Sequence, residues 1–209
     1  MNDGWPSNPF STRFVSPGQL RFIGMKQGSL DQLAVKLVQQ NGNGQIVGPH
    51  GVGKTTLSFE LENRVARLSD TQTPFRFVRK TIGPRQAIRS GHQNASFESI
   101  PTKTILVIDG FERLSWFQRV ALLKTCRRRQ IGVLLTTHRA VKGIPMLVSL
   151  KPDQRQFESV VTELTRDYES QISTERLSEI FIGNNRNTRE ALMSCYDEFE
   201  ANRMKPVEP

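Results

Sequence analysis

A glycine-rich stretch, GPHGVGKTT at residues 48–56, constrains the fold of this chain more than any other feature. It fits the pattern G-x-x-x-x-G-K-[ST], and it stands between a short apolar run, GQIV, and a segment with helical apolar spacing. In such a loop, glycines let backbone N–H groups converge on phosphate oxygens at the positive end of the following helix. The sequence therefore predicts a buried strand, a phosphate-binding loop and an amphipathic helix in succession.

The residue types within this loop suit the parts of a nucleoside triphosphate. Lys54 is expected to reach the β- and γ-phosphates, and the Thr55 hydroxyl is expected to join the ligand shell of Mg²⁺. His50 could contact a phosphate, although a solvated loop histidine is the simpler explanation. The predicted nucleotide-binding residues of the loop are Gly48, Pro49, His50, Gly51, Val52, Gly53, Lys54, Thr55 and Thr56.

Patterns typical of strands and helices alternate along the chain. Short apolar runs predict five strands, at 44–48, 75–80, 104–109, 132–137 and 145–150. Helical spacing separates some of these runs, and two helices have a predicted capping box, one with Ser29 and Gln32 and one with Ser115 and Gln118. The alternation predicts an α/β fold, a three-layer arrangement in which helices cover both faces of a mostly parallel five-stranded sheet.

From residue 153 onward the apolar spacing is wholly helical. It predicts three short helices that form a small C-terminal helical lid, the second of them ending at Gly183 as a C-cap. The first residues are rich in Pro, Gly and Ser and predict an irregular arm. The expected division is an arm at 1–28, a nucleotide-binding core at 29–152, the lid at 153–203 and a frayed tail at 204–209.

Composition narrows the setting of the protein. No segment approaches the ~20 apolar residues that a membrane-spanning helix needs, and the N-terminus lacks the basic and apolar regions of a signal peptide. Cys126 and Cys195 lie in helical patterns, which favours buried thiols in a reducing cytoplasm over a disulfide. The expected location is therefore cytoplasmic, with no membrane contact. A net charge of +9 and an isoelectric point near 10.1 leave nucleic acid open as a partner.

A second motif, TILVIDGFERL at residues 104–114, begins with the predicted third strand. Asp109 ends the apolar run, so its carboxylate is expected at the carboxyl edge of the sheet, where it would hold Mg²⁺ through water. The next residue, Gly110, has no side chain that could act as a base. Glu112 is the first acid after Asp109.

The phosphate loop (a Walker A pattern), the five strands and the helical tail together resemble the AAA+ and STAND branch of P-loop ATPases, over nearly the whole chain. LVIDGFERL is similar to the NACHT-type STAND signature, in which an acid three places after the first Asp polarises the attacking water. The resemblance implies that Glu112 is the catalytic base, that Arg113 replaces the final acid of the signature, and that ATP hydrolysis is slow. The alternative is that Glu112 only begins a turn and that the chain binds ATP without cleaving it.

The resemblance also implies roles for residues outside the two motifs. In VLLTTHR, Thr137 would lie near the γ-phosphate, as sensor-1 residues do. His138 stands where many STAND relatives have Arg; it would contact the phosphate or the attacking water, or only cap the strand. RNTREAL is similar to a lid-helix pattern that places Arg189 at sensor 2, although a lone helical Arg is more often solvated. In NPF, Phe10 would pack near adenine or else fill the edge of a core. ATP is expected rather than GTP, because no Asn-Lys-x-Asp motif is present.

Basic residues gather at 79–92 and at 124–130. Either segment could grip nucleic-acid phosphates or supply an Arg to the ATP of a neighbouring subunit, although solvated faces explain both as simply. Neither segment has interleaved aromatic residues for base stacking. The sequence thus predicts a switch that binds Mg·ATP, hydrolyses it slowly and acts through a protein partner or a homo-oligomer. The alternatives are a DNA-associated accessory ATPase, a non-hydrolysing nucleotide-gated scaffold and a small-molecule kinase.

Overall fold

The computed structural model describes residues 7–68, 75–82, 104–168 and 172–203. Its described residues fall into two compact units. The sheet unit spans 25–49 and 54–150, and the helical unit comprises the N-terminal residues up to 24, the short stretch 50–53 and the chain from 151 onward. Each unit has its own apolar core. Of the residues predicted for the nucleotide site, Gly48, Pro49, Lys54, Thr55 and Asp109 belong to the sheet unit, and residues 50–53 belong to the helical unit.

The sheet unit contains one five-stranded sheet in the order β2-β3-β4-β1-β5. All four neighbouring pairs are parallel, so the carboxyl ends of the strands meet at one edge of the sheet. This confirms the predicted α/β class and all five predicted strands, with small shifts at their ends. The strands are β1 Gly44–Val47, β2 Arg76–Thr81, β3 Thr104–Asp109, β4 Gly132–Thr137 and β5 Met146–Ser149.

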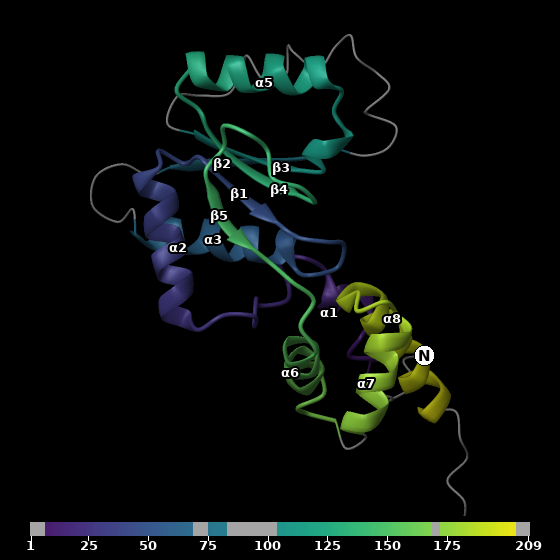
Figure 1. Cartoon of the computed structure of the whole chain (residues 1–209). Coiled ribbons are helices and arrows are strands. Elements are labelled where there is room, and N and C mark those ends of the chain that lie inside the picture. The colour runs from purple at the N-terminus through teal and green to yellow at the C-terminus, as the bar shows by residue number, and fades with distance from the viewer. Residues whose placement is uncertain (1–6, 69–74, 83–103, 169–171, 204–209) are drawn as a thin grey trace, which may run out of the picture. The chain divides into compact units, whose positions relative to one another are not determined.

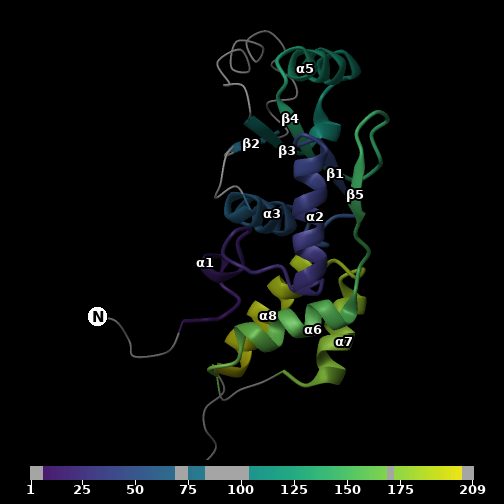
Figure 2. The same ribbon diagram turned by 90° about the vertical axis from the view of Figure 1, so that its left-hand side faces the viewer.

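Helices cover both faces of this sheet (Figures 1 and 2). One face is covered by α2 (Gln27–Gln39) and α3 (Lys54–Leu68), and the other by α5 (Trp116–Arg128). Because side chains alternate between faces along a strand, every second residue of β3 and β4 turns toward α5. The cluster on that face is Leu106, Ile108, Val133 and Leu135 of the strands with Leu122 and Cys126 of the helix. The central strands β1, β3 and β4 are therefore buried on both sides, as their continuous apolar runs predict, while the edge strands β2 and β5 are partly exposed.

Two helix ends differ from the sequence prediction. Helix α2 begins at Gln27 with Lys26 as its N-cap, so Ser29 lies inside the first turn and the predicted capping box there is wrong. Helix α7 ends at Gly183 as predicted, but its C-cap is Asn184 rather than Gly183. The capping box of α5 is confirmed, since Ser115 and Gln118 exchange side-chain and backbone hydrogen bonds.

The helical unit contains the three helices predicted for the end of the chain. They are α6 Gln154–Leu164, α7 Thr174–Gly183 and α8 Thr188–Arg203, and a short helix, α1 Thr12–Val15, precedes them in sequence. Their apolar faces share one core, in which Phe157 and Phe181 stack at 5.2 Å between ring centroids. Phe10 is 2% exposed and belongs to the same core. The Asn8 side chain donates to the Tyr196 carbonyl oxygen and so ties the N-terminal segment to α8.

Both cysteines are free and buried. Burial raises the pKa of Cys126 to about 11 and that of Cys195 to about 12. Both thiols are therefore neutral at physiological pH and pack as small apolar groups. Within the described residues, no helix is long and apolar enough to cross a membrane.

Candidate nucleotide-binding site

The phosphate loop connects the carboxyl end of β1 to the first residue of α3. Its first glycine is fixed to the neighbouring strand, because Gly48 N–H donates to the carbonyl oxygen of Thr137 over 3.1 Å. Lys54 opens α3 and is nearly buried, and its ammonium group donates to the carbonyl oxygens of Gly48 (2.7 Å) and Pro49 (2.6 Å). Two loop carbonyl oxygens thus hold a lysine ammonium at the N-terminus of a helix, where an anion would also be stabilised.

Two glycines of the loop adopt backbone conformations that other residues rarely reach. Gly51 has φ +74° and Gly53 has φ +85°. Within the helical unit, a Cβ atom at Gly51 would lie 1.7 Å from Asn187 Oδ1, and one at Gly53 would lie 3.1 Å from a ring carbon of Phe22. Both positions therefore favour glycine for conformation, and Gly51 also leaves no space for a Cβ atom unless Asn187 moves.

The charge of Lys54 is not compensated inside the loop. Burial lowers the pKa of Lys54, while Glu112 and Asp109 raise it to a lesser extent. Its direct partners are neutral carbonyl groups, so a phosphate oxygen would meet a desolvated cation with hydrogen-bond capacity to spare. This environment favours the binding of a polyanion.

Asp109 lies at the carboxyl end of β3 and accepts hydrogen bonds from two threonines. Thr55 Oγ1 donates to Asp109 Oδ2 over 3.0 Å, and Thr136 Oγ1 donates to Asp109 Oδ1. Thr136 is the register partner of Asp109 in the β3–β4 ladder, which explains their contact. Sequence reasoning missed Thr136, although the alternation of side chains along β4 could have indicated it. A carboxylate and a hydroxyl are hard oxygen ligands, so these residues fit Mg²⁺ bound directly or through water.

A tight turn after β3 brings Glu112 back toward the sheet. Gly110 has φ +81°, and the 3₁₀ turn Phe111–Arg113 follows it. Arg119 holds this turn: its side chain donates to the carbonyl oxygens of Leu114 (2.8 Å) and Glu112. Gly110, which stands where related proteins have an acid, therefore allows the backbone to turn. Arg119 is a positioning residue that sequence reasoning missed.

Gly110→Ala is expected to lower the free energy of unfolding by about 1–3 kcal/mol. A Cβ atom at Gly110 would lie 2.9 Å from the Ile82 carbonyl oxygen, and the positive φ adds strain. Gly28→Ala, in α2 of the same unit, is the matched control because its Cβ would meet nothing within 4 Å. Urea unfolding checks both variants, and Gly28→Ala should be neutral or slightly stabilising. Equal effects from the two substitutions would contradict this account of the turn.

His138 connects the turn to the phosphate loop. Its Nε2 lies 2.9 Å from Glu112 Oε1, and its Nδ1 lies 3.2 Å from the Gly48 carbonyl oxygen. Both oxygens are acceptors when Glu112 is ionised, so both contacts are hydrogen bonds only when the ring carries two protons. The second carboxylate oxygen, Glu112 Oε2, is buried and has no hydrogen-bond partner among the described residues. The structure thus brings Glu112, His138 and the first residue of the loop together.

The side chains of the three other residues predicted for the site make no hydrogen bond to the phosphate loop in the described part of the chain, although the Thr137 backbone is bonded to Gly48. Thr137 follows the alternation that turns Val133 and Leu135 toward α5, and its buried hydroxyl has no partner in the described part of the chain. Arg189 is exposed near the start of α8, and its backbone nitrogen would lie 3.3 Å from a Cβ atom at Gly51. Phe10 lies in the core of the helical unit, so its ring fills a core in this structure. The sensor and adenine contacts of these residues stay predictions.

The predicted basic segments have different environments. In 79–92, only residues up to 82 are described, so Arg85 and Arg89 lie outside the described residues. Arg79 is engaged: it pairs with Glu62 at 2.9 Å, and its guanidinium lies 3.6 Å from the centroid of the Phe59 ring. In 124–130, by contrast, Lys124, Arg127 and Arg128 are exposed. The second segment is therefore the better candidate for binding an anionic partner.

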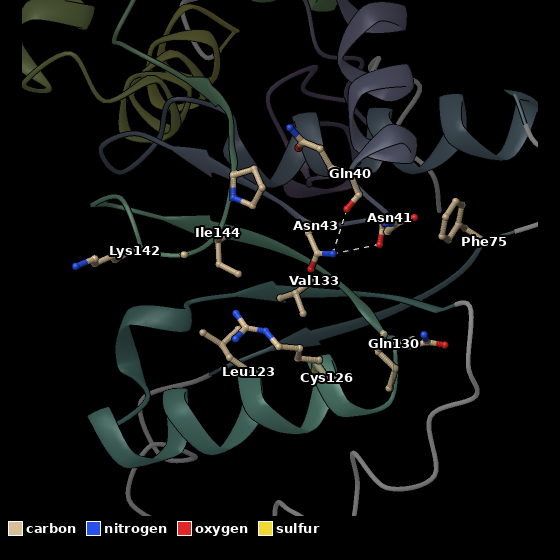
Figure 3. Close-up of a pocket in the computed structure, with 14 residues that line it drawn as sticks. Gln40, Asn41, Asn43, Phe75, Leu123, Cys126, Gln130, Val133, Lys142 and Ile144 are labelled. Atoms are coloured by element: carbon tan, nitrogen blue, oxygen red, sulfur yellow. Dashed lines mark hydrogen bonds between the residues drawn. The ribbon is translucent and has the colours of Figure 1, made fainter.

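A cavity of about 790 Å³ lies at the opposite, amino edge of the sheet (Figure 3). Asn43, Ile131 and Pro145, which come just before β1, β4 and β5, line it. Asn41 lines the cavity too, and its carbonyl oxygen accepts a hydrogen bond from the Asn43 side-chain amide. Since the strands are parallel, this cavity is separated from the phosphate loop by the length of the strands.

Comparison with known proteins finds similar folds at low sequence identity. No protein-family model matches the sequence, and no curated protein matches it. The ORC1 protein of Aeropyrum pernix in complex with DNA is similar in structure, with a TM-score of 0.64 at 16% identity over 92% of this chain and 65% of that chain. Drosophila ORC bound to DNA is also similar, with a TM-score of 0.60 at 17% identity over 94% of this chain and 61% of that chain.

The RuvB Holliday junction branch migration motor of Thermotoga maritima is also similar, with a TM-score of 0.55 at 16% identity over 81% of this chain and 60% of that chain. The chain therefore spans less than two thirds of each of these structures. Its place in the STAND branch stays a prediction. What the likenesses show is that this chain has the parallel α/β P-loop fold of the AAA+ ATPases.

Proposed function

We propose that this chain binds Mg·ATP at the phosphate loop and hydrolyses it slowly, acting as a nucleotide-dependent switch of the AAA+/STAND type. The observation that carries the proposal is the carboxylate of Asp109, held by Thr55 and Thr136 beside the buried ammonium of Lys54. A lysine and a hydroxyl–carboxylate pair at the carboxyl edge of a parallel sheet are the groups that a triphosphate and its metal ion need. When bound, Mg²⁺ would neutralise charge on the phosphates.

Glu112 is the proposed general base. Its Oε2 would take a proton from the attacking water as the water oxygen bonds to the γ-phosphorus and the bond to the ADP oxygen breaks. Lys54 would hold phosphate oxygens throughout this step. His138 contacts the other carboxylate oxygen, Oε1, and therefore acts as a positioning residue.

Slow turnover is proposed on the family resemblance, in which the acid that polarises water stands three places after the first Asp. His138 contacts both Glu112 Oε1 and the Gly48 carbonyl oxygen, so it links the position of Glu112 to the phosphate loop. A partner that moved His138 would therefore change the position of Glu112 and the rate of hydrolysis, which is the behaviour of a switch.

Arg189 is proposed to sense the γ-phosphate from the lid, and ATP is proposed over GTP on the family resemblance. A DNA-associated ATPase is the second candidate function. It is favoured by the exposed cations of α5, and two of the similar structures are described as bound to or in complex with DNA. A small-molecule kinase and a non-hydrolysing scaffold are the remaining alternatives.

One product analysis separates these candidates. The purified chain is incubated with Mg·ATP, with and without candidate acceptors, and ADP and free phosphate are both quantified. Equal amounts of ADP and phosphate support the proposal. ADP formed without phosphate, only when an acceptor is present, would replace it with a kinase. ATP bound tightly but recovered intact would leave a nucleotide-gated scaffold.

A further inference from the structure

Helix α5 is the outermost described element on its side of the sheet unit (Figures 1 and 2). Its inner face is anchored by Leu122 and Cys126 in the core. The opposite face carries side chains at the spacing i, i+4 and i+8, which places them along one stripe. We call this the outer stripe of α5: Trp116, Val120 and Lys124, flanked by Phe117 and Arg128 and by Arg127, which also lines the cavity at the amino edge of the sheet.

Two aromatic rings at the start of the stripe are open to solvent. Trp116 is 67% exposed and Phe117 is 76% exposed. The two rings contact each other edge to face, with 5.0 Å between their centroids. Val120, one turn further on, is 45% exposed. Adjacent large rings that add nothing to the core are typical of a binding surface.

The rest of the stripe is cationic. Lys124, Arg127 and Arg128 are exposed, and none of them has an ion pair with a described carboxylate. The sequence of α5, WFQRVALLKTCRR, contains no Asp or Glu. The stripe runs for ~18 Å at 1.5 Å per residue from Trp116 to Arg128. An anionic partner is therefore complementary to the C-terminal half of the stripe, beside the aromatic rings of its first half.

Rings next to cations favour one chemical class of partner. Single-stranded nucleic acid presents unpaired bases that stack on aromatic side chains and phosphates that pair with Lys and Arg. A duplex hides its base faces and would use only the cations. The sequence prediction that segment 124–130 lacks stacking residues is thus incomplete, because Trp116 and Phe117 lie on the same helix face.

We propose that the outer stripe of α5 binds single-stranded nucleic acid, with bases stacked on Trp116 and Phe117 and phosphates paired with Lys124, Arg127 and Arg128. This surface is formed by residues other than those of the ATP site, so the inference goes beyond the proposed function and is tested without nucleotide. It assigns a role to the exposed rings that the ATP site does not use.

The test is a fluorescence titration of the full chain. Trp5 is the other tryptophan, so a Trp5→Phe background leaves Trp116 as the reporter. Oligo(dT) and oligo(rU) of about 16 nucleotides are added at low salt, beside a duplex of equal length. Quenching by both single strands is expected. A higher affinity for one of the two strands would show whether the surface prefers DNA or RNA.

Variants then separate stacking from charge. With labelled oligonucleotides, Trp116→Ala and Phe117→Ala should each weaken single-strand binding about tenfold and leave duplex binding unchanged. Binding is also measured as a function of salt concentration. Replacing the three cations with Ala should reduce the magnitude of the slope of log K against log[salt] by about 2, because each phosphate contact contributes about 0.7. Trp116→Phe should retain most binding. The matched controls are Ile182→Ala and Met193→Ala, both exposed apolar residues of the helical unit.

Several results would overturn the proposal. One is that neither single strand binds at low salt. Another is that the affinity for single strands is unchanged by both ring substitutions. If the duplex binds as tightly as the single strands, and neither ring substitution changes the affinity, the stripe binds nucleic acid through its charge alone. Concentration-dependent self-association that Trp116→Ala abolishes, without nucleic acid, would make it a protein interface. Because both rings are exposed, the variants should fold, and circular dichroism checks that they do.

Discussion

Glu112→Gln is expected to lower the rate of phosphate release from Mg·ATP by about 100-fold or more. The substitution keeps the shape of the side chain and its carbonyl-type contact with His138 Nε2, but the amide cannot accept the proton of the attacking water. ATP affinity should change little, because Glu112 is proposed to contact water rather than phosphate. Single-turnover release of phosphate and equilibrium ATP binding, measured on the same preparation, check both statements.

Glu175→Gln is the matched control for this prediction. Glu175 is an exposed acid in the first turn of α7, so its neutralisation removes the same charge outside the proposed catalytic residues. If Glu112→Gln hydrolyses ATP at the wild-type rate, Glu112 is not the base. If it loses ATP binding together with turnover, Glu112 supports the loop instead of acting on water.

Lys54→Met is expected to weaken ATP binding roughly 10- to 100-fold, the range of one or two charge-assisted hydrogen bonds to phosphate. Methionine keeps the apolar stem and removes only the ammonium group, which donates to the Gly48 and Pro49 carbonyl oxygens. The burial that lowers the pKa of Lys54 also makes a phosphate partner more stabilising there than at the surface. Isothermal titration of wild type and variant measures the difference.

Lys36→Met supplies the control on the same unit. Lys36 also donates to a backbone carbonyl oxygen, that of Met146, but it does so on α2, away from the loop residues. Its loss should leave ATP affinity unchanged. Equal affinities for wild type and Lys54→Met would mean that the loop does not hold the triphosphate through its lysine.

Much of the sheet and the loop could be predicted because their signals are local. Apolar runs of four to six residues mark the strands, and the glycine pattern fixes where β1 ends and α3 begins. Helix ends are weaker signals. Ser29 has the sequence of an N-cap, yet the helix starts before it, so local propensity did not decide the boundary.

The contacts that define the site depend on strand pairing, which single residues do not reveal. Asp109 meets Thr136 because β3 and β4 are neighbours in this register, and the same pairing brings His138 to Glu112. Arg119 reaches back to the turn from the next helix. Exposure is likewise a property of the fold: the sequence alone could not show that Trp116 and the basic end of α5 share an outer face.

The central claim is that the loop holds Mg·ATP, and the affinity of the unaltered chain for ATP tests it most directly. Equilibrium titration with ATP in Mg²⁺ and again in EDTA needs no substitution. Saturable binding of one ATP per chain, weakened when EDTA removes the metal, is the predicted result. No binding up to millimolar ATP in the presence of Mg²⁺ would contradict the account.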